Sequence, residues 1–415
     1  MNNDSSTRAA GPLTGVRVID LSTILLGPFT TQILGDMGAD VIKVESPLGD
    51  ATRDVGPPPA DGMGAVFLGT NRNKRSIVLD LKQDVARQAL LRLATEADVF
   101  VHNMRPQAIA RLGLDYANLA EARADIIYCG SYGFRASGPY GNKAAFDDMI
   151  QAASGLAALQ NRDAAPRYVT SAVADKITGM AVANAVVMAL YHRERSGQGQ
   201  CVEVPMFETM VNFNMVEHLY GRVYEPARGR TGYPRTLSPD RRPYATKDGY
   251  IGVLPYTDRQ WQAFFALAER PDLAADPRYQ SLNKRLENID ALYADLSKVL
   301  LMRTSAQWLQ ALDAANIPAM PVHDPDALPE DAHLIAGDFW EMHEDPELGR
   351  LRFPGPSAMF SATPGGFRRL PPRLGEHSVQ ILAEAGFGDG DIDAMWSGGA
   401  RYQHNDGSSP VGRGE

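Results

Sequence analysis

Short apolar segments that alternate with helical patterns constrain the first half of this 415-residue chain more than any other feature. Apolar strand-like runs lie at 16–20, 40–45, 76–81, 98–101, 125–128 and 201–205, and helical patterns lie between them, chiefly at 27–37, 84–94 and 174–195. Strands joined by helices pair in parallel, because the helices cover both faces of the sheet. The pattern therefore predicts an α/β, Rossmann-like large domain over residues 1–205.

The remainder of the chain predicts a smaller α/β domain between two long linkers. The stretch Arg222–Arg242 holds six arginines and no apolar periodicity, so residues 206–243 are expected to be a linker. The small domain is placed at 244–324 by a turn, a strand and three helices, at 246–249, 250–254, 259–268, 288–301 and 305–314. A Pro-rich linker at 325–372 and a segment at 373–415 follow, the latter with helices at 374–386 and 389–396 that return to the large domain, and a polar tail.

Charge and cysteine content narrow the class of protein. The formal net charge is −9, which argues against a general nucleic-acid binder. Two cysteines, Cys129 and Cys201, rule out a disulfide scaffold and fit a reducing compartment. The polar segment 1–11 lacks the apolar core of a signal peptide, and the apolar run 177–191 is shorter than a membrane span. A cytoplasmic protein without nucleic-acid or membrane partners is expected.

Common cofactor motifs are missing from the sequence. The first strand is followed by Leu21–Pro28, which lacks the G-x-G-x-x-G turn of dinucleotide-binding domains. No Walker A, H-E-x-x-H or G-x-S-x-G sequence occurs, and the eight histidines do not cluster with carboxylates at metal-ligand spacing. No metal or redox cofactor is therefore expected.

Two segments are candidates for binding an anionic ligand. The run Asn103–Pro106 follows the strand at 98–101 and precedes a helix that carries Arg111. Ligands bind beyond the carboxyl ends of parallel strands, and a helix start with a nearby arginine suits a phosphate. The alternative is a helix begun by a proline, with arginines on the surface. The cationic run Asn71–Ser76 is likewise either a phosphate site or a solvated strand entrance.

Asp175 lies at the start of the long apolar helix and has two interpretations. As an N-cap or first-turn residue it would satisfy free backbone N–H groups. As a catalytic residue it would be a carboxylate nucleophile that the same helix end keeps ionised. The chemistry of this position by itself favours the first interpretation.

Ten segments, spread from about residue 11 to 397, resemble in the same order the family III CoA-transferases, which include formyl-CoA, carnitine and bile-acid CoA-transferases. They are 15–21, 27–28, 38–45, 73–77, 98–103, 138–140, 174–175, 194–200, 317–322 and 372–377. The resemblance implies that Asp175 is the catalytic aspartate and that Asp147 is an acidic residue beside it. It also implies that CoA contacts eight residues, namely Ile24, Leu25, Leu26, Asn71, Lys74, Asn103, Met104 and Arg111.

The function implied by the resemblance is transfer of CoA from an acyl-CoA donor to a free carboxylic acid, through an aspartyl anhydride and an aspartyl-CoA thioester. Coenzyme A would enter as a substrate, and the assembly would be a homodimer of two interlocked rings. Two alternatives remain open: an acyl-CoA racemase of the same fold, and a non-catalytic acyl-CoA-binding protein in which Asp175 is only a cap. The related racemases have Gly-His-Asp where this chain has Ala145-Phe146-Asp147, and phenylalanine carries no transferable proton.

Several positions bear on the substrate. Ser46 and Leu25 stand where formyl-CoA transferase has an arginine and a glutamine, and its glycine-rich lid has no equivalent before Tyr244. A formyl/oxalyl substrate pair is therefore not expected. The Arg222–Arg242 stretch either helps to select an acid with a second carboxylate or is a solvated linker or dimer contact.

Overall fold

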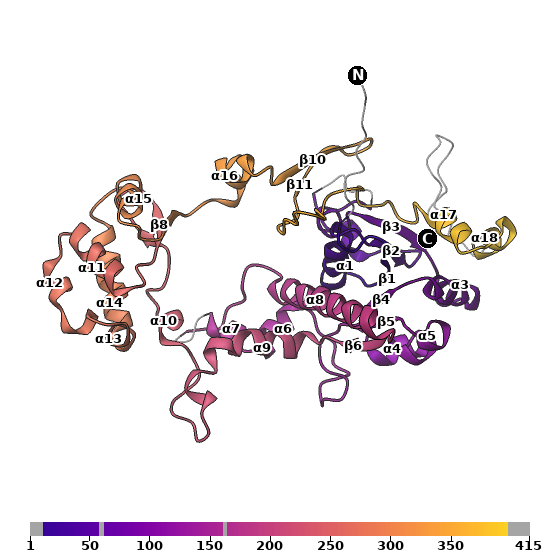
Figure 1. Cartoon of the computed structure of the whole chain (residues 1–415), viewed down its shortest axis with the longest axis horizontal. Coiled ribbons are helices and arrows are strands. Elements are labelled where there is room, and N and C mark those ends of the chain that lie inside the picture. The colour runs from indigo at the N-terminus through magenta and orange to yellow at the C-terminus, as the bar shows by residue number, and fades with distance from the viewer. Residues whose placement is uncertain (1–10, 58–61, 161–163, 397–415) are drawn as a thin grey trace. The chain divides into compact units, whose positions relative to one another are not determined.

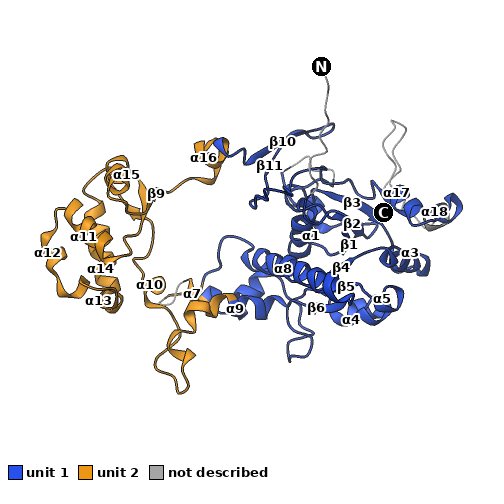
Figure 2. Cartoon of the chain, viewed as in Figure 1, with its two compact units in different colours: residues 1–157, 167–212, 336–415 blue, residues 158–166, 213–335 orange. Residues whose placement is uncertain are grey.

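The computed structural model describes residues 11–57, 62–160 and 164–396 (Figure 1). The chain divides into two compact units, each with its own hydrophobic core (Figure 2). Unit 1 comprises residues 1–157, 167–212 and 336–415, and unit 2 comprises 158–166 and 213–335. Both units are therefore discontinuous in sequence, and their limits differ from the domain and linker boundaries predicted from composition.

A six-stranded parallel sheet forms the centre of unit 1, as predicted. Its strands are β1 (Arg17–Leu21), β2 (Asp40–Glu45), β3 (Lys74–Val78), β4 (Val99–His102), β5 (Ile127–Gly130) and β6 (Gln200–Glu203). They lie in the order β3-β2-β1-β4-β5-β6, and β1 pairs in parallel with β2 on one side and β4 on the other. This is the strand order of the doubly wound α/β folds, in which the order of the strands reverses between β1 and β4.

Alternate residues of the strands supply two separate cores. Val18 of β1 packs in a cluster with residues of α1 (Leu26–Asp36) and α8 (Val173–Ser196). Its neighbour Ile19 packs in the other cluster, with α3 (Asp84–Thr95), α5 (Tyr116–Ala122) and α17 (Ser378–Glu384). Because successive side chains of a strand point to opposite faces, both faces of the sheet are covered by helices. Shorter helices complete the unit: η1 (Ala51–Asp54), α2 (Ala65–Thr70), α4 (Pro106–Arg111), α6 (Asp147–Ala153) and α18 (Asp389–Trp396). A further helix, α7 (Leu156–Leu159), begins in unit 1 and ends in unit 2.

The C-terminal segment of the chain lies along the edge strand β3. The backbone N–H of His377 donates to the Ser76 carbonyl over 3.0 Å, and the N–H of Val78 donates to Ser378 Oγ over 3.1 Å. This pairing covers the edge of the sheet, which would otherwise expose unpaired backbone groups.

The segment 325–372, predicted as an irregular linker, contains regular structure. It includes η4 (Pro325–Glu330), α16 (Ala332–Ala336) and an antiparallel hairpin of β10 (Trp340–Asp345) and β11 (Gly349–Pro354). Gly349 follows the hairpin turn with a φ of +74°, a conformation that favours glycine. The prolines on either side conceal the strands in the sequence, because proline is usually a sign of irregular chain.

Unit 2 is a small α/β unit. Its sheet is antiparallel, in the order β7 (Tyr244–Ala245), β8 (Tyr250–Val253), β9 (Ala319–Pro321). Its helices are α10 (Pro234–Leu237), α11 (Asp258–Leu267), α12 (Pro271–Ala275), η3 (Pro277–Tyr279), α13 (Leu282–Glu287), α14 (Ile289–Leu300) and α15 (Ser305–Ala314). The segment 206–243, predicted as a linker, begins with α9 (Met206–His218) and η2 (Tyr220–Val223). Aromatic residues, among them Trp261, Phe264 and Trp308, fill the core of the unit.

Helix α8 carries Asp175 and is longer than its apolar run. Its 24 residues are long enough and apolar enough to cross a membrane by length and composition alone. Its buried residues, such as Val182 and Val186, belong to the core that α1 and the sheet share. One side of α8 therefore packs on this core.

Candidate active site

A cavity of about 310 Å³ opens at the carboxyl ends of β1 and β4, where the strand order of unit 1 reverses. Its lining residues are Thr23, Ile24, Leu25, Leu26, Asn103, Met104, Arg105, Ser131, Tyr132, Gly133, Lys143, Ala144, Ala145, Phe146, Asp175 and Met206. Six of the ten residues predicted for the site are among them. This is the position at which open α/β sheets bind their ligands.

The turn between β1 and α1 forms one wall of the cavity and has an unusual backbone. Ile24 adopts a φ of +73°, in the left-handed region that β-branched residues rarely occupy. Side chains from other elements hold the turn: Asn103 pairs with both backbone groups of Thr23, at 3.2 Å and 2.7 Å. The Asn103 side chain therefore joins the ends of β1 and β4 at the cavity.

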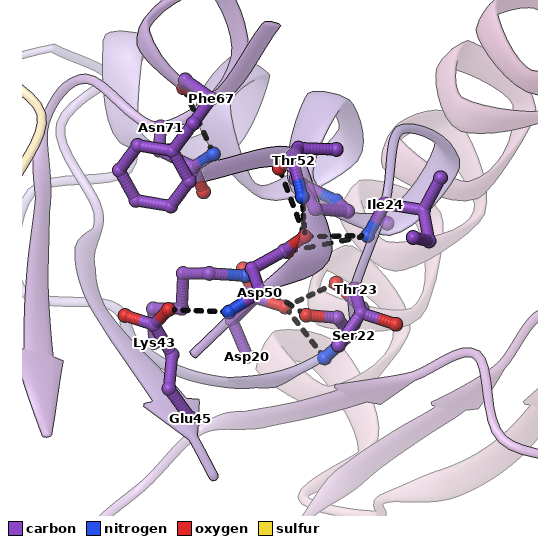
Figure 3. Close-up of polar contacts among 12 residues, drawn as sticks. Asp20, Ser22, Thr23, Ile24, Lys43, Glu45, Asp50, Thr52, Phe67 and Asn71 are labelled. Atoms are coloured by element: carbon purple, nitrogen blue, oxygen red, sulfur yellow. Dashed lines mark hydrogen bonds and ion pairs between the residues drawn. The ribbon is translucent and has the colours of Figure 1, made fainter. Parts of the chain in front are cut away.

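A buried network of charged side chains supports this turn from below. Figure 3 shows the Asp50 carboxylate beside Ile24, Lys43 and Thr52. The Lys43 ammonium donates to Asp50 and to the Ser22 carbonyl, each over 2.9 Å. Burial alone would raise the pKa of Asp50, but Lys43 and the hydrogen bonds from Thr52 hold it below its usual value. Asp50 is therefore an anion within the protein.

Asn71 and Lys74, predicted as CoA ligands, lie in the same network and not on the cavity wall. The Lys74 ammonium donates to Asp20, the Pro28 carbonyl and Asn71 Oδ1 at 2.9–3.1 Å, which uses all three of its protons. Burial lowers its pKa to about 8 despite the neighbouring Asp20. In this structure both residues support the α1 turn, so direct contact with CoA would require them to give up these bonds.

Arg111, the third predicted ligand outside the cavity lining, is exposed in the last turn of α4. Two other cations, Arg105 and Lys143, line the cavity. Sequence reasoning missed Lys143 because it lies 32 residues from Arg111, the nearest predicted ligand, in an irregular segment. Its position in the run Gly141–Ala145, just before Asp147, was the available signal.

Asp175 lines the cavity, and the structure shows that it does not cap its helix. The N-cap of α8 is Ala172, and Asp175 is the third helical residue. Its backbone N–H is taken by Asp147, whose Oδ2 accepts it over 2.9 Å. Among the described residues, no donor reaches the Asp175 carboxylate. Asp175 is therefore a first-turn residue, as one form of the first interpretation has it, but it is not the N-cap: Asp147, from α6, accepts the free N–H.

The electrostatics of Asp175 also differ from expectation. Burial, followed by the carboxylates of Asp147 and Asp148, raises the pKa of Asp175 to about 7. Burial and the two acidic neighbours thus act against the ionised form of Asp175, which the helix end was expected to favour. A carboxyl group with a pKa near 7 in a cavity is typical of a functional site.

The start of α8 offers less to an oxyanion than its N-terminal position suggests. The N–H of Val173 donates to the Ser171 carbonyl over 2.7 Å, and that of Asp175 is held by Asp147. These two backbone donors are therefore occupied. Across the described parts of the chain, no group of three or more acidic, histidine or cysteine side chains could hold a metal ion.

A doubly wound α/β unit with two cations and a carboxyl group of raised pKa around its switch-point cavity has the organisation of an enzyme for anionic substrates. The chain belongs to CoA-transferase family III, whose sequence model matches residues 13–378. It is 32% identical to mouse succinyl-CoA:glutarate CoA-transferase over 400 residues, which cover 95% of this chain and 91% of the mouse protein. It is 34% identical to succinate–glutarate CoA-transferase of Agrobacterium fabrum over 388 residues, covering 90% of this chain and 95% of that one.

A solved structure shows the same fold. The crystal structure of a CaiB/BaiF family protein from Brucella suis superposes with a TM-score of 0.76 at 31% sequence identity. The superposition covers 91% of this chain and 100% of the Brucella chain. The family resemblance noted from the sequence is thereby confirmed, and the protein is a family III CoA-transferase homologue.

Proposed function

We propose that this protein transfers CoA from an acyl-CoA donor to a dicarboxylic acid, with Asp175 as the covalent nucleophile. The observation that carries the proposal is the Asp175 carboxylate itself. It lines the cavity, no donor among the described residues holds it, and its backbone N–H is satisfied by Asp147. A carboxylate that no structural bond holds is available for chemistry.

The reaction proceeds by four acyl exchanges. A carboxylate oxygen of Asp175 attacks the donor thioester carbonyl, and the C–S bond breaks to release CoA thiolate and leave a mixed anhydride. The thiolate attacks the aspartyl carbonyl, which forms an aspartyl-CoA thioester and releases the donor carboxylate. The acceptor carboxylate attacks this thioester, which forms a second mixed anhydride and again releases the thiolate. Attack of the thiolate on the acceptor carbonyl yields the new acyl-CoA and restores Asp175.

The raised pKa of Asp175 suits this role. A carboxylate that burial and acidic neighbours destabilise is a stronger nucleophile than one in water. The positive side chains of Lys143 and Arg105 line the same cavity and are suited to the phosphates of CoA. Asn103 and Met104, proposed from the sequence as CoA contacts, line the same cavity.

The acid substrates are proposed from the relatives. The two transferases compared above are named for succinyl-CoA or succinate and for glutarate. We propose that a four- or five-carbon dicarboxylic acid is the acceptor here.

A homodimer is proposed from one face of α8. Met180, Val187, Met188 and Tyr191 are 56%, 43%, 67% and 63% exposed. Their spacing places them along one side of the helix. An exposed apolar stripe of this kind is costly in water and is typical of a protein interface. The interlocking of two rings is proposed from the family resemblance alone.

The test is an exchange assay with purified protein. Succinyl-CoA is supplied with glutarate, and glutaryl-CoA is measured by chromatography. The proposal predicts its formation at the rate of succinyl-CoA loss, with a larger kcat/KM for glutarate than for pentanoate. Loss of succinyl-CoA only by hydrolysis, equal with and without glutarate, would contradict CoA transfer.

A further inference from the structure

The β1–α1 turn holds a conformation that its own residues do not favour. Within the described chain, six non-glycine residues have a positive φ, and Ile24 is the only β-branched one among them. Such a side chain clashes with its own backbone in the left-handed region. Something outside the turn must therefore hold Ile24 there.

Asp50 supplies that restraint. Both carboxylate oxygens of Asp50 lie 3.2 Å from the backbone nitrogen of Ile24 and accept its N–H. The same carboxylate accepts from the backbone and hydroxyl of Thr52, at 3.0 Å and 2.8 Å, so it is fixed by its own segment. Asp50 is 1% exposed, and its bond to Ile24 is sheltered from competition with water.

Lys43 completes a clamp around the turn. Its ammonium, which is fully buried, bridges Asp50 Oδ2 and the Ser22 carbonyl. A chain of contacts therefore runs from the Ser22 carbonyl through Lys43 and Asp50 to the Ile24 N–H (Figure 3). It fixes the two backbone groups whose relative orientation defines the turn.

The clamped turn and Asp175 line the same cavity. Ile24, Leu25 and Leu26 line the cavity, whereas Asp50 and Lys43 do not. We propose that Asp50, locked by Lys43, is a positioning residue that holds the Ile24 turn so that a bound acyl-CoA presents its carbonyl to Asp175. The catalytic consequence of the clamp rests on the proposed function, whereas the clamp itself rests only on the hydrogen bonds described above.

The main test is a double-mutant cycle of Asp50→Asn and Ile24→Gly. Glycine adopts a positive φ without strain, so the turn in Ile24→Gly needs the clamp less. Asp50→Asn is expected to lower kcat at least about tenfold in the wild-type background, since a misplaced substrate loses its alignment. In the Ile24→Gly background the same change should cost about threefold or less. Equal losses in both backgrounds would overturn the proposal.

Asp36→Asn is the matched control. Asp36 is a buried carboxylate at the far end of α1, paired with Arg72 over 2.7 Å, and it has no contact with the turn. Its loss should lower stability but leave kcat within about twofold, because alignment at the cavity is unchanged. A fall in kcat equal to that of Asp50→Asn would show a general effect of removing buried charge and would contradict the positioning role.

Hydrogen exchange tests the clamp by a measurement that does not depend on enzyme activity. Amides of residues 22–26 should exchange at least about tenfold faster in Asp50→Asn than in the wild type, because the Ile24 bond is lost. Unchanged exchange would overturn the clamp. If the wild type transfers no CoA, the proposed function is wrong. The hydrogen-exchange rates of residues 22–26 still test the clamp in that case.

If Asp50→Asn does not fold, Ile24→Gly and Ile24→Val decide the question. The glycine variant relieves the strain and should have the higher thermal midpoint of the two. A lower midpoint for glycine than for valine would mean that the turn is unstrained and would overturn the clamp.

Discussion

The Asp147 carboxylate accepts the backbone N–H of Asp175 over 2.9 Å, across 28 residues of sequence. Asp147 is 8% exposed, and Gln151 also donates to it, over 2.5 Å. This contact gives Asp147 the capping role and brings a second negative charge next to the catalytic candidate. Asp147 thus both orients the start of α8 and raises the pKa of Asp175.

Removing the charge of Asp147 should shift the pH dependence of the enzyme. Asp147→Asn keeps an oxygen for the Asp175 N–H but removes the repulsion, so the pKa of Asp175 should fall by about one unit. The acidic limb of kcat/KM against pH should move to lower pH by the same amount. Asp148→Asn is the control. Asp148 raises the pKa of Asp175 less than Asp147 does, so the shift of the acidic limb should be smaller. An unshifted limb in Asp147→Asn would refute the electrostatic account.

The raised pKa of Asp175 carries a cost in stability with a defined sign. The folded pKa of about 7 lies above the ordinary value of 3.8, so the native state binds more protons between these values. This contribution to stability is present below about pH 4 and is lost as pH rises through about 7. Asp175→Asn should therefore unfold at a higher urea concentration than wild type at pH 8, with the difference vanishing near pH 4. Equal midpoints at pH 8 would show that burial does not disfavour the carboxylate.

Lys74 and Lys143 should respond in opposite ways to removal of their charge. Lys74→Met leaves Asp20 buried without its cation and should cost about 3–5 kcal/mol of folding free energy. Lys143→Met should leave the unfolding midpoint nearly unchanged but weaken CoA binding about tenfold, as expected for a phosphate contact. Calorimetric titration with CoA and urea unfolding measure the two effects. A stable Lys74→Met protein with weakened CoA binding would instead support Lys74 as a direct ligand.

The racemase alternative predicts proton exchange that the transferase does not. Phe146 lines the cavity and is 64% exposed, and it cannot carry a proton to the α-carbon of an acyl-CoA. A chiral 2-methylacyl-CoA incubated in deuterated water without an acceptor acid should take up no deuterium beyond the uncatalysed rate. Mass spectrometry of the recovered ester measures this. Rapid uptake that Asp175→Ala abolishes would establish the racemase.

Local pattern predicted the sheet of unit 1 well. Val18 and Ile19 belong to opposite cores, so the apolar run of β1 signals a strand covered on both faces. The ends of helices such as α15 (Ser305–Ala314) were also predictable, because Thr304 and Gln307 form a capping box. The β10–β11 hairpin was missed because its flanking prolines and glycines resemble a linker.

The site was less predictable than the fold because its contacts join distant segments. Lys74 lies in a cationic run that suggests a phosphate site, yet its ammonium donates to Asp20, 54 residues away in the sequence. The sequence position of Asp175 is typical of a helix cap, but its backbone N–H donates to Asp147, which could not be predicted from the sequence. The positive φ of Ile24 has no signature in its residue type, since Asp50 imposes it from another element.

Mass spectrometry of the enzyme during turnover tests the central claim most directly. Wild-type protein mixed with succinyl-CoA should carry a CoA adduct that peptide mapping places on Asp175, and hydroxylamine should remove it. Asp175→Ala should carry no adduct and lose activity by several orders of magnitude, while still folding and binding CoA. A folded Asp175→Ala protein that transfers CoA at the wild-type rate would contradict the account.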